Sequence, residues 1–434
     1  MFNVAASGSS VRTEIIAGTT TFLTMAYIIF VQPAVLAAAG MDAGAVFTAT
    51  CLASAIGTLI MALGANYPFA VAPAMGHNFF FAFTVVVAGG TPWPVALGAV
   101  AIAGLIFIVT AGFGLRERVI RAMPESFTHA IGVGIGLLIA LIGLEWGGIV
   151  VDSPATLVTL GSFGSPPVLV TIGALVVMAV LHARGVPGAA LIGMLGATVV
   201  ALAVGLTRFE GVLSTPPSLA PTLLKLDLAG ALSPGLIEAV FVFFFLALFD
   251  SIGSLVALTN RIGLAANGSF PRARQALLAD AVGTVVGAGL GTSTVTAYVE
   301  SSAGVAAGGR TGLASVVTAG LFLVALFFSP LVKLVAGGYQ VPGGLTLYPI
   351  IAPVLILVGV TMMEGAGKVK WNDFTEAMPA FLAIVTIPLA FSITDGIAFG
   401  FIAYAILKPA TGRARELHPL TYFLAALLLL RYLL

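Results

Sequence analysis

Charged residues are scarce in this chain, and their scarcity argues against most soluble classes of protein. Only 8% of the 434 residues are charged, whereas an ordinary soluble domain has roughly a quarter. Hydrophobic residues make up 59% of the chain, and the mean hydropathy is +1.14. The net charge of +1 provides no basic surface for a nucleic acid. We therefore expect a polytopic membrane protein that is surrounded by lipid and binds no nucleic acid.

Cysteine is equally scarce, and recognisable catalytic motifs are missing. The single Cys51 cannot form a disulfide framework or a thiolate metal site within the chain. The sequence contains no GxSxG, HExxH, CxxC or GxxxxGK[ST] motif. We expect neither an enzyme nor a cofactor or bound metal. The first residues, MFNVAASGSSVRTE, lack a short apolar core with a cleavage site, so we also expect no removable signal peptide.

Long apolar runs dominate what the chain does contain. A membrane-spanning helix needs about 20 mostly apolar residues, and this length predicts an all-α membrane protein with fourteen spans. The first seven lie near residues 14–37, 45–65, 73–88, 94–114, 127–149, 166–182 and 187–207. The second seven lie near residues 235–258, 275–290, 294–308, 312–336, 345–363, 376–391 and 393–408. The apolar stretch at 418–434 fits either an additional span or an interfacial helix.

The third and tenth spans differ from the others in composition. They contain APAMGHNFFFAF and GTSTVTAYVESS, which are short and rich in glycine, threonine or aromatic residues. We expect short extended stretches in both. Irregular backbone at membrane depth is tolerated only where it is buried in protein or lines a cavity.

The distribution of basic residues tests this span count, because cytoplasmic loops concentrate Lys and Arg. With a cytoplasmic N-terminus, fourteen of the eighteen basic residues fall on the cytoplasmic side and three outside, and Arg431 stays unassigned. The cytoplasmic set is Arg12, Arg116, Arg118, Arg121, Arg184, Arg261, Arg272, Arg274, Arg310, Lys368, Lys370, Lys408, Arg413 and Arg415, and the external set is Arg208, Lys225 and Lys333. This asymmetry predicts a multi-pass protein of the cell (inner) membrane with its N-terminus in the cytoplasm.

An internal repeat relates the two series of spans. A shift of 219 residues places TVVVAGG at 84–90 over AGVAAGG at 303–309. Because each copy holds seven spans, the second copy must enter the membrane from the opposite side. Such inverted repeats are typical of secondary transporters, in which discontinuous elements of the two halves frame a site near the midplane.

Two carboxylates within the spans are the leading site candidates. A charge at membrane depth costs roughly 2.5 to 3.5 kcal/mol on insertion scales, so it persists where it is paired, protonated or facing a cavity. Asp250 lies near the middle of the eighth span, and Glu300 lies in the tenth, between Val299 and Ser301, which we include as substrate-binding candidates. Two carboxylates that share a site do not both ionise cheaply, so we expect the pair to bind one proton. Asp280 in the ninth span either relays protons or holds the tenth span in place.

The third span supplies further candidates. Asn78 carries both a donor and an acceptor for a planar ligand, although its amide equally suits the task of satisfying loose backbone. Phe79, Phe80 and Phe81 offer ring faces for stacking, or they simply pack. His77 is a weaker candidate beside them.

Five segments, which together extend over nearly the whole chain, carry a resemblance to a known family. They are TEIIAGTTTFLTMAYIIFVQPAVL, MGHNFFFAF, LFDSIGSL, ADAVGTVVGAGLGTSTVTAYVESSAGVAAGGRTGL and ITDGIAFGFIAYAILK. They resemble the nucleobase/ascorbate transporter family in its AzgA-like purine permease branch. By matching motifs, Glu300 and Asp250 correspond to carboxylates of the substrate site, and Asn78 corresponds to an asparagine of the third span. Two positions depart from the family pattern: Ala247 stands where many members have an acid, and His77 stands where Leu is common.

The resemblance also implies a division into two domains. Residues 14–114 and 235–336 would form a core domain, residues 127–207 and 345–408 a gate domain, and residues 409–434 a C-terminal tail. Substrate would bind in the core beside the gate, and the core would move against the gate. We expect Gly132, Gly134 and Gly136 to let the fifth span pack closely on the core. A homodimer is compatible with this arrangement.

Three functions compete. The leading one is a symporter that imports a purine base (adenine, guanine, hypoxanthine or xanthine) with a proton, or alternatively with sodium, because two acceptor-rich side chains match the N–H edges of a purine. The runner-up is a sulfate- or bicarbonate-type anion exchanger, whose site would use Arg, Lys or helix N-termini without competing acids. A channel would need a continuous polar pore, and only two broken segments are present.

Overall fold

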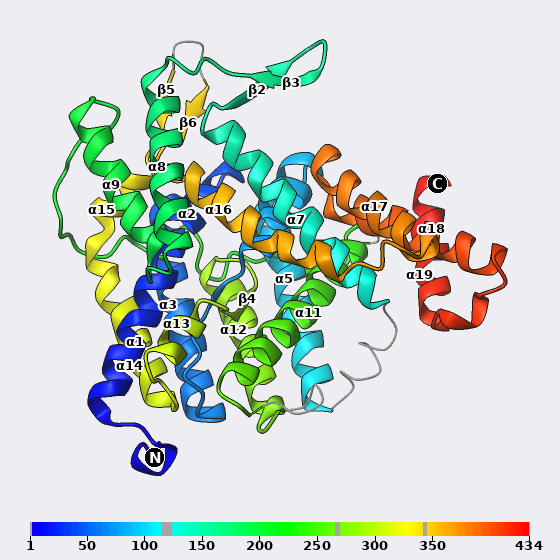
Figure 1. Ribbon diagram of the computed structural model, residues 1–434, viewed down its shortest axis with the longest axis horizontal. Helices are drawn as coiled ribbons and strands as arrows, with labels where there is room; N and C mark the ends of the chain where they lie inside the picture. The colour runs from blue at the N-terminus through cyan, green and yellow to red at the C-terminus, as the bar shows by residue number, and fades with distance from the viewer. Residues whose placement is uncertain (1, 114–123, 234, 265–269, 342–344, 434) are drawn as a thin grey trace.

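The computed structural model describes residues 2–113, 124–233, 235–264, 270–341 and 345–433. Arg116, Arg118 and Arg121, which we assign to the cytoplasmic side, lie outside the described residues. The described chain is mostly helical, as predicted (Figure 1). Eight of its helices are long and apolar enough to cross a membrane: Val11–Ala38, Ala43–Ala65, Trp93–Gly112, Glu125–Trp146, Pro166–Ala183, Ile237–Arg261, Gly312–Ala336 and Ile393–Ala410. Further apolar helices are shorter, so the exact number of spans stays a prediction.

The elements of the first repeat follow the predicted spans. Its helices are α1 (Val11–Met25), α2 (Ile28–Ala38), α3 (Ala43–Ile60), α4 (Met75–Phe79), α5 (Trp93–Gly112), α7 (Glu125–Trp146), α8 (Pro166–Ala183) and α9 (Ala189–Ala203). Two π-helical segments extend α3 and α4, namely η2 (Met61–Ala65) and η3 (Phe80–Ala88), and a 3-10 turn, η1 (Ala5–Ser7), precedes α1. Its strands are β1 (Val71–Pro73), β2 (Val150–Ser153) and β3 (Leu157–Leu160).

The second repeat has the same order around its broken span, but its paired surface strands come before its fifth span rather than after it. Its helices are α10 (Leu228–Ala231), α11 (Ile237–Arg261), α12 (Ala273–Leu290), α13 (Ser301–Ala306), α14 (Gly312–Ala325), α15 (Ser329–Ala336), α16 (Ala352–Met362), α17 (Phe374–Leu389) and α18 (Ile393–Ala410), followed by α19 (Pro419–Leu433). Short 3-10 turns are η4 (Leu326–Phe328), η5 (Met363–Lys368) and η6 (Ala414–Glu416), and the strands are β4 (Val295–Ala297), β5 (Tyr339–Gln340) and β6 (Thr346–Leu347).

Side-chain caps explain where several of these helices begin. Ser10 accepts a hydrogen bond from the backbone N–H of Thr13 at the start of α1, and Asp42 caps α3 in the same way. Glu14 caps a helix other than its own: its buried carboxylate accepts hydrogen bonds from three backbone N–H groups at the start of α14. This carboxylate thereby joins the first span to the eleventh.

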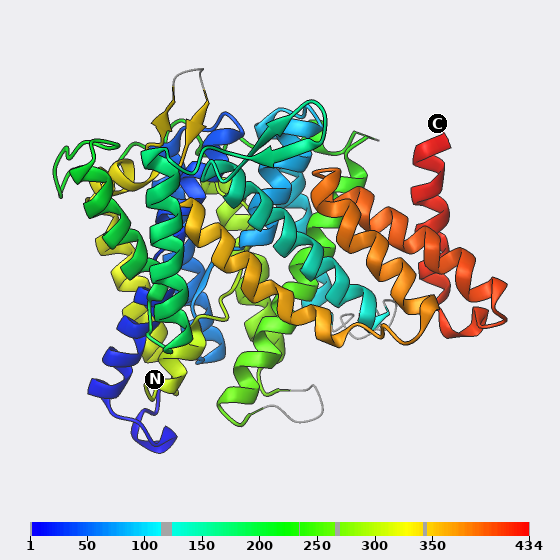
Figure 2. The same cartoon turned by 45° about the horizontal axis from the view of Figure 1, so that its top comes forward.

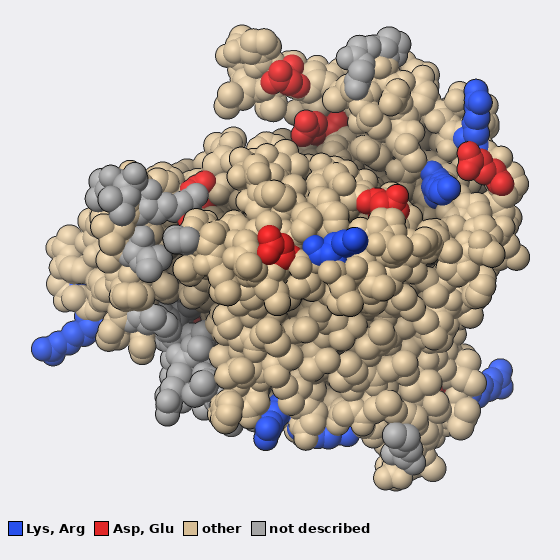
Figure 3. Space-filling view, turned by 180° about the vertical axis from the view of Figure 1, so that it is seen from behind, with Lys and Arg blue, Asp and Glu red and all other residues tan. Residues whose placement is uncertain are grey.

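The helices pack in two groups. In the first group α1, α2, α3, α5, α11, α12 and α14 surround β1 and β4. In the second, α7 lies along α16, and this pair contacts α8 and α9 at one end and α17 and α18 at the other. Figures 1 and 2 show α17, α18 and α19 at the side of the molecule farthest from the N-terminus. On the face in Figure 3, charged side chains lie mainly toward the two ends, and a broad area between them carries few.

Two matching threonines make the inverted repeat visible in the packing. Thr58 on α3 accepts from the N–H of Val71 at 2.9 Å and donates to its carbonyl at 3.1 Å. Thr284 on α12 does the same to Val295, at 3.2 and 3.0 Å. The motifs are AIGTLI at 55–60 and AVGTVV at 281–286, so the spacing here is 226 residues rather than 219. The fold therefore contains the predicted inverted repeat.

The prediction that glycines of the fifth span face the core was wrong. A Cβ atom at Gly134 would lie 2.6 Å from Ile387 on α17, and one at Gly136 would lie 2.6 Å from Met362 on α16. A Cβ atom at Gly132 would have no neighbouring atom within 4 Å among the described residues. The glycines therefore let α7 pack closely on helices of its own group.

Candidate functional site

The third and tenth spans are broken as the sequence predicted, and their extended parts pair with each other. β1 and β4 run antiparallel with Val71 opposite Ala297, Ala72 opposite Thr296 and Pro73 opposite Val295. Both strands are fully buried. The short helices α4 and α13 follow them, so four half-elements meet at this crossing, which we call the β1–β4 crossing.

Glu300 lies at the β1–β4 crossing, at the residue before α13. Its Oε1 atom accepts a hydrogen bond from the hydroxyl of Tyr27 at 2.5 Å, and its side chain is half-buried. Tyr27 stands at the break between α1 and α2, where hydrogen bonds tighten from i→i−4 to i→i−3. Thr24 donates to the Glu300 carbonyl at 3.3 Å. The kink in the first span thus holds this carboxylate in place.

Asp250 reaches the same crossing from α11. Its Oδ2 atom accepts a hydrogen bond from Thr296 of β4 at 3.0 Å, and the Ser254 hydroxyl lies 3.5 Å from its Oδ1 atom. Its side chain is 44% exposed, so it faces open space rather than packed protein. Because Thr296 is only four residues before Glu300, both predicted carboxylates lie along β4 and the turn that follows it.

Asn78 is tied to the opposite side of the crossing through Gln32 of α2. Its Nδ2 atom donates to Gln32 Oε1 at 2.5 Å. Gln32 in turn donates to the hydroxyls of Thr292 and Ser293, just before β4, at 2.9 and 3.0 Å. All four side chains are buried. The amide N–H₂ of Asn78 is therefore engaged, whereas its Oδ1 atom has no hydrogen-bond partner among the described residues.

The remaining predicted residues are placed as follows. Phe79 and Phe80 are fully buried, with ring centroids 5.6 Å from Phe83 and 4.7 Å from Phe243, respectively. Ser301 accepts from the backbone N–H of Ala70 at 3.0 Å, which fastens α13 to the segment before β1. Val299 is 47% exposed, beside Glu300. These contacts show packing and fastening, and a role in binding for these side chains stays a prediction.

Buried polar atoms without partners gather at the β1–β4 crossing. Among the described residues they are His77 Nδ1 and Nε2, Asn78 Oδ1, Ser251 Oγ, Thr294 Oγ1 and both carboxylate oxygens of Asp280, and three further hydroxyls lie on α1 and α3. Ser251 and the backbone of Ala297 lie near Asp280 without reaching hydrogen-bonding geometry. Because an unpaired buried polar group costs about 1–3 kcal/mol, such a concentration is typical of a site that binds a polar ligand.

One groove lies away from the two carboxylates. A groove of about 410 Å³ between α8 and α9 is lined by small and apolar residues, and neither Asp250 nor Glu300 contributes to it. Within the described residues, no three His, Cys, Asp or Glu side chains converge as metal ligands would.

Sequence reasoning missed Tyr27, Gln32, Thr296 and the paired Thr58 and Thr284. Gln32 had a signal, because it is a lone amide within IIFVQPAVLAA, as conspicuous as the lone acid of the eighth span. The threonines had one in the repeated AxGT motif. Tyr27 and Thr296 had none, because aromatic and threonine residues are common in such apolar segments.

The sequence comparisons with known proteins all point to permeases. The model of a family described as "Permease family" matches residues 12–399. A putative permease of Methanocaldococcus jannaschii is 48% identical over 427 residues, which are 98% of this chain and 95% of that protein. The adenine permease AdeP of Escherichia coli is 44% identical over 432 residues (99% and 95%), and the guanine/hypoxanthine permease PbuG of Bacillus subtilis is 45% identical over 438 residues (98% and 97%).

Solved structures share the fold at low sequence identity. The transmembrane domain of the cyanobacterial bicarbonate transporter BicA superimposes with a TM-score of 0.64 at 16% identity, covering 89% of this chain and 96% of that one. The structure of SLC26A9 gives a TM-score of 0.62 at 13% identity, covering 93% and 66%. At these identities the likeness establishes the architecture and leaves the cargo open.

Proposed function

Because this chain belongs to the permease family, within the nucleobase/ascorbate transporters, we propose that it imports purine nucleobases by secondary active transport. It is a membrane transporter rather than an enzyme. Relatives named as adenine and as guanine/hypoxanthine permeases support a purine cargo. The observation that carries the proposal is the placement of Asp250 and Glu300 at β4 and the turn after it. The rest of the fold is built mainly from apolar helices.

The chemistry of the two carboxylates suits a purine. A purine base is planar and presents N–H donors along its edges, and ionised carboxylates are acceptors only. In our proposal Glu300, held by Tyr27, accepts from one edge, and Asp250, held by Thr296, accepts from another. Asn78 adds its free Oδ1 atom. Phe79, Phe80, Val299 and Ser301 shape the walls around the base.

The same carboxylates are proposed to couple transport to a proton. Asp250 is partly exposed on one side and hydrogen-bonded to β4 on the other, so a change in its protonation alters a contact with the broken tenth span. A proton that binds this pair together with the base, and leaves with it, ties uptake to the proton gradient. Sodium is the alternative coupling ion.

The two helix groups are proposed to act as core and gate. In this scheme residues 14–114 and 235–336 carry the base, and they move against residues 127–207 and 345–408, while 409–434 form a tail. We propose an inner-membrane location with a cytoplasmic N-terminus, from the distribution of Lys and Arg.

Uptake into proteoliposomes tests the proposal. Labelled adenine, guanine, hypoxanthine and xanthine are offered under an imposed pH gradient, under a sodium gradient, and with no gradient. We expect accumulation of at least one base under the pH gradient, abolished by a protonophore. Uptake that needs sodium would replace the proton by sodium. Transport of sulfate or bicarbonate with no response to purines would establish the anion exchanger instead.

A further inference from the structure

His77 is a buried side chain that the proposed mechanism has not yet used. It lies on α4 at the β1–β4 crossing and is only 3% exposed. Neither ring nitrogen has a hydrogen-bond partner among the described residues. The Leu246 backbone of α11 is near the ring but makes no hydrogen bond within the usual geometry. Buried polar groups are nearly always paired in folded proteins, so these two nitrogens point to a ligand.

The direction of the ring follows from its distance to Asp250. His77 Nδ1 lies 3.9 Å from Asp250 Oδ2, too far for a direct hydrogen bond, which in proteins rarely exceeds about 3.2 Å. Asp250 Oδ2 is also the atom that Thr296 holds. The imidazole thus stands beside the more exposed carboxylate, on the residue that precedes Asn78 in α4.

Free donors at the crossing are few: among the described residues, the buried hydroxyls of Ser251 and Thr294 lack partners, as do the nitrogens of His77. When ionised, Asp250 and Glu300 can only accept hydrogen bonds, and the N–H₂ group of Asn78 already donates to Gln32. The hydroxyl of Tyr27 donates to Glu300. A neutral imidazole carries one N–H donor and one acceptor. Besides the hydroxyls of Ser251 and Thr294, His77 therefore offers an uncommitted donor, and its ring lies 3.9 Å from Asp250.

Purine edges require such a donor beside an acceptor. In hypoxanthine and guanine the N1–H donor is adjacent to the O6 acceptor, and in adenine the N6–H donor is adjacent to the N1 acceptor. A carboxylate alone pairs with the donor and leaves the neighbouring acceptor unpaired, which is costly in a buried site. Asp250 and His77 together match both atoms.

We propose that His77 contacts the substrate and donates a hydrogen bond to the purine atom next to the N–H group that Asp250 binds, which makes it a determinant of base preference. This inference rests on the proposed purine cargo and deepens it. It assigns the six-membered ring edge of the base to the side of the site formed by α4 and α11. Glu300, which lies at the end of the turn after β4, then faces the remaining edge of the base.

A ligand pair isolates this hydrogen bond. Hypoxanthine and its 6-thio analogue both carry N1–H, but sulfur is a much weaker acceptor than oxygen. Inhibition constants of both are measured against uptake of labelled hypoxanthine, or of whichever base the parent protein transports. We expect the parent to prefer the oxygen compound by about tenfold, as a site built to hydrogen-bond one group discriminates against its absence. In His77→Leu the ratio should fall to near one, and His77→Gln, which keeps an N–H donor, should restore part of it.

His129→Leu on α7 is the matched control, because it makes the same replacement away from the β1–β4 crossing and should keep the parent ratio. If His77→Leu fails to accumulate in the membrane, His77→Met removes the donor with an unbranched apolar side chain. A parent ratio retained in the donor-free variant would overturn the inference while leaving purine transport intact. A parent protein that transports no purine would instead overturn the proposed function, and the inference with it.

Discussion

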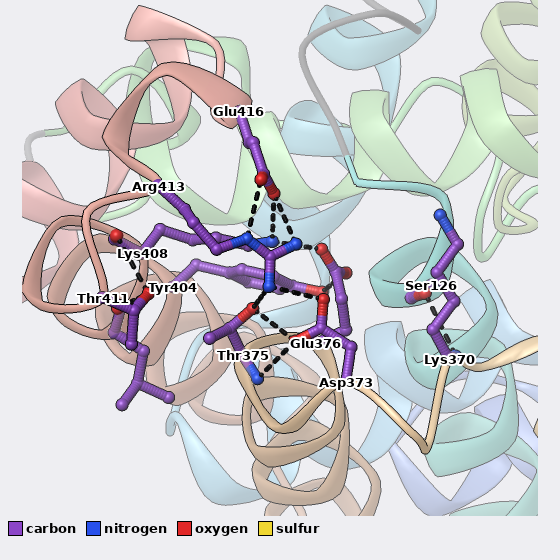
Figure 4. A network of polar contacts seen from close by, with 11 residues as sticks. Ser126, Lys370, Asp373, Thr375, Glu376, Tyr404, Lys408, Thr411, Arg413 and Glu416 are labelled. Atoms are coloured by element: carbon purple, nitrogen blue, oxygen red, sulfur yellow. Dashed lines mark hydrogen bonds and ion pairs between the residues drawn. The ribbon is translucent and has the colours of Figure 1, made fainter.

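Two polar regions of this protein differ in how completely their groups are paired. Where α17 begins and α18 ends, Arg413 pairs with Asp373 at 2.7 Å and with Glu416 at 2.6 Å, and Lys408 pairs with Glu376 at 2.7 Å and with Glu416 at 2.8 Å (Figure 4). At the β1–β4 crossing, by contrast, buried nitrogens and oxygens lie without partners in the part of the chain that the structure describes. The first region, which we call the hairpin network, ties the helix hairpin of α17 and α18 to the segment after it. The second region leaves its hydrogen-bonding groups available to a ligand.

The contrast separates a structural network from a binding site without reference to any relative. Charges in the hairpin network satisfy one another, so their removal should lower stability. Polar groups at the crossing raise the cost of folding unless a ligand pairs with them. Proteins accept that cost at functional sites. Variants in the two regions should therefore fail in different assays.

The largest expected effect is that of Glu300→Gln on transport. The amide keeps the size of the side chain and an oxygen for Tyr27, but it loses the charge that accepts from the base. We expect the initial rate of purine uptake to fall on the order of 100-fold, with normal amounts of protein in the membrane. Glu364→Gln, at an exposed position in η5, should transport like the parent. Wild-type uptake by the Glu300 variant would make Glu300 a structural residue.

Asp250→Asn should separate coupling from binding. The variant keeps an acceptor for Thr296 and loses the titratable group. Because Asp250 is also proposed to bind the base, we expect exchange of internal for external base to weaken but persist, while accumulation driven by a pH gradient falls by about a further tenfold or more. The comparison is made in one batch of proteoliposomes, with exchange as the internal control. Accumulation equal to that of the parent would assign the proton to another residue.

Lys408→Met should weaken the hairpin network rather than the site. The lysine is 1% exposed and holds Glu376, whose side chain is 12% exposed and would be left without a cation. We expect a loss on the order of 2 kcal/mol of stability, seen as a lower melting temperature in detergent, with an unchanged KM for uptake. Lys368→Met, at an exposed position, serves as the control. A changed KM with unchanged melting would reverse the roles given to the two regions.

Thr58→Val and Thr284→Val should have similar effects, because each removes one clamp on a strand of the crossing. Each leaves a backbone N–H and a carbonyl of Val71 or Val295 unsatisfied, at a cost of about 1–2 kcal/mol. Melting temperatures of the two single variants and of the double variant measure this. A large loss in one and none in the other would show that the repeat symmetry does not extend to the energetics.

The smallest effect concerns the pH dependence of the hairpin network. Hydrogen bonds from Thr375 and Arg413 lower the pKa of Asp373 from 3.8 to about 2, and hydrogen bonds from Arg413 and Lys408 lower the pKa of Glu416 from 4.5 to about 2. Both pKa values are lower in the folded state, so this stabilisation is present above about pH 4.5 and disappears as the pH falls toward 2. Melting curves of the parent and of Glu416→Gln should converge over that range. Curves that stay parallel would show that the pair contributes nothing.

Much of the fold could be predicted from sequence because it depends on run length and composition. Apolar runs gave the spans, and Gly and Thr within them marked the breaks at β1 and β4. Small residues mark a close contact without naming the partner, which is why Gly134 was assigned to the wrong group. The direction of that contact depends on the packing of α7 and α17, which no local pattern encodes.

The candidate site was predictable where a residue is anomalous for its surroundings. Asp250 and Glu300 stand out because charge is rare at membrane depth. The supporting residues Tyr27 and Thr296 do not stand out, because they owe their roles to a kink and to strand pairing that appear only in three dimensions. His77 was visible as a histidine, but only the structure shows that its ring lies beside Asp250 and that its nitrogens lack partners among the described residues.

Equilibrium binding tests the central claim most directly, namely that the unpaired groups of the β1–β4 crossing form a purine site. Labelled adenine, guanine and hypoxanthine are titrated against purified parent protein and Glu300→Gln, with unlabelled purines, sulfate and bicarbonate as competitors. The account predicts saturable binding of at least one base to the parent, displaced by purines and not by the anions, and at least tenfold weaker in the variant. Equal binding by the two proteins, or displacement by sulfate or bicarbonate, would contradict it.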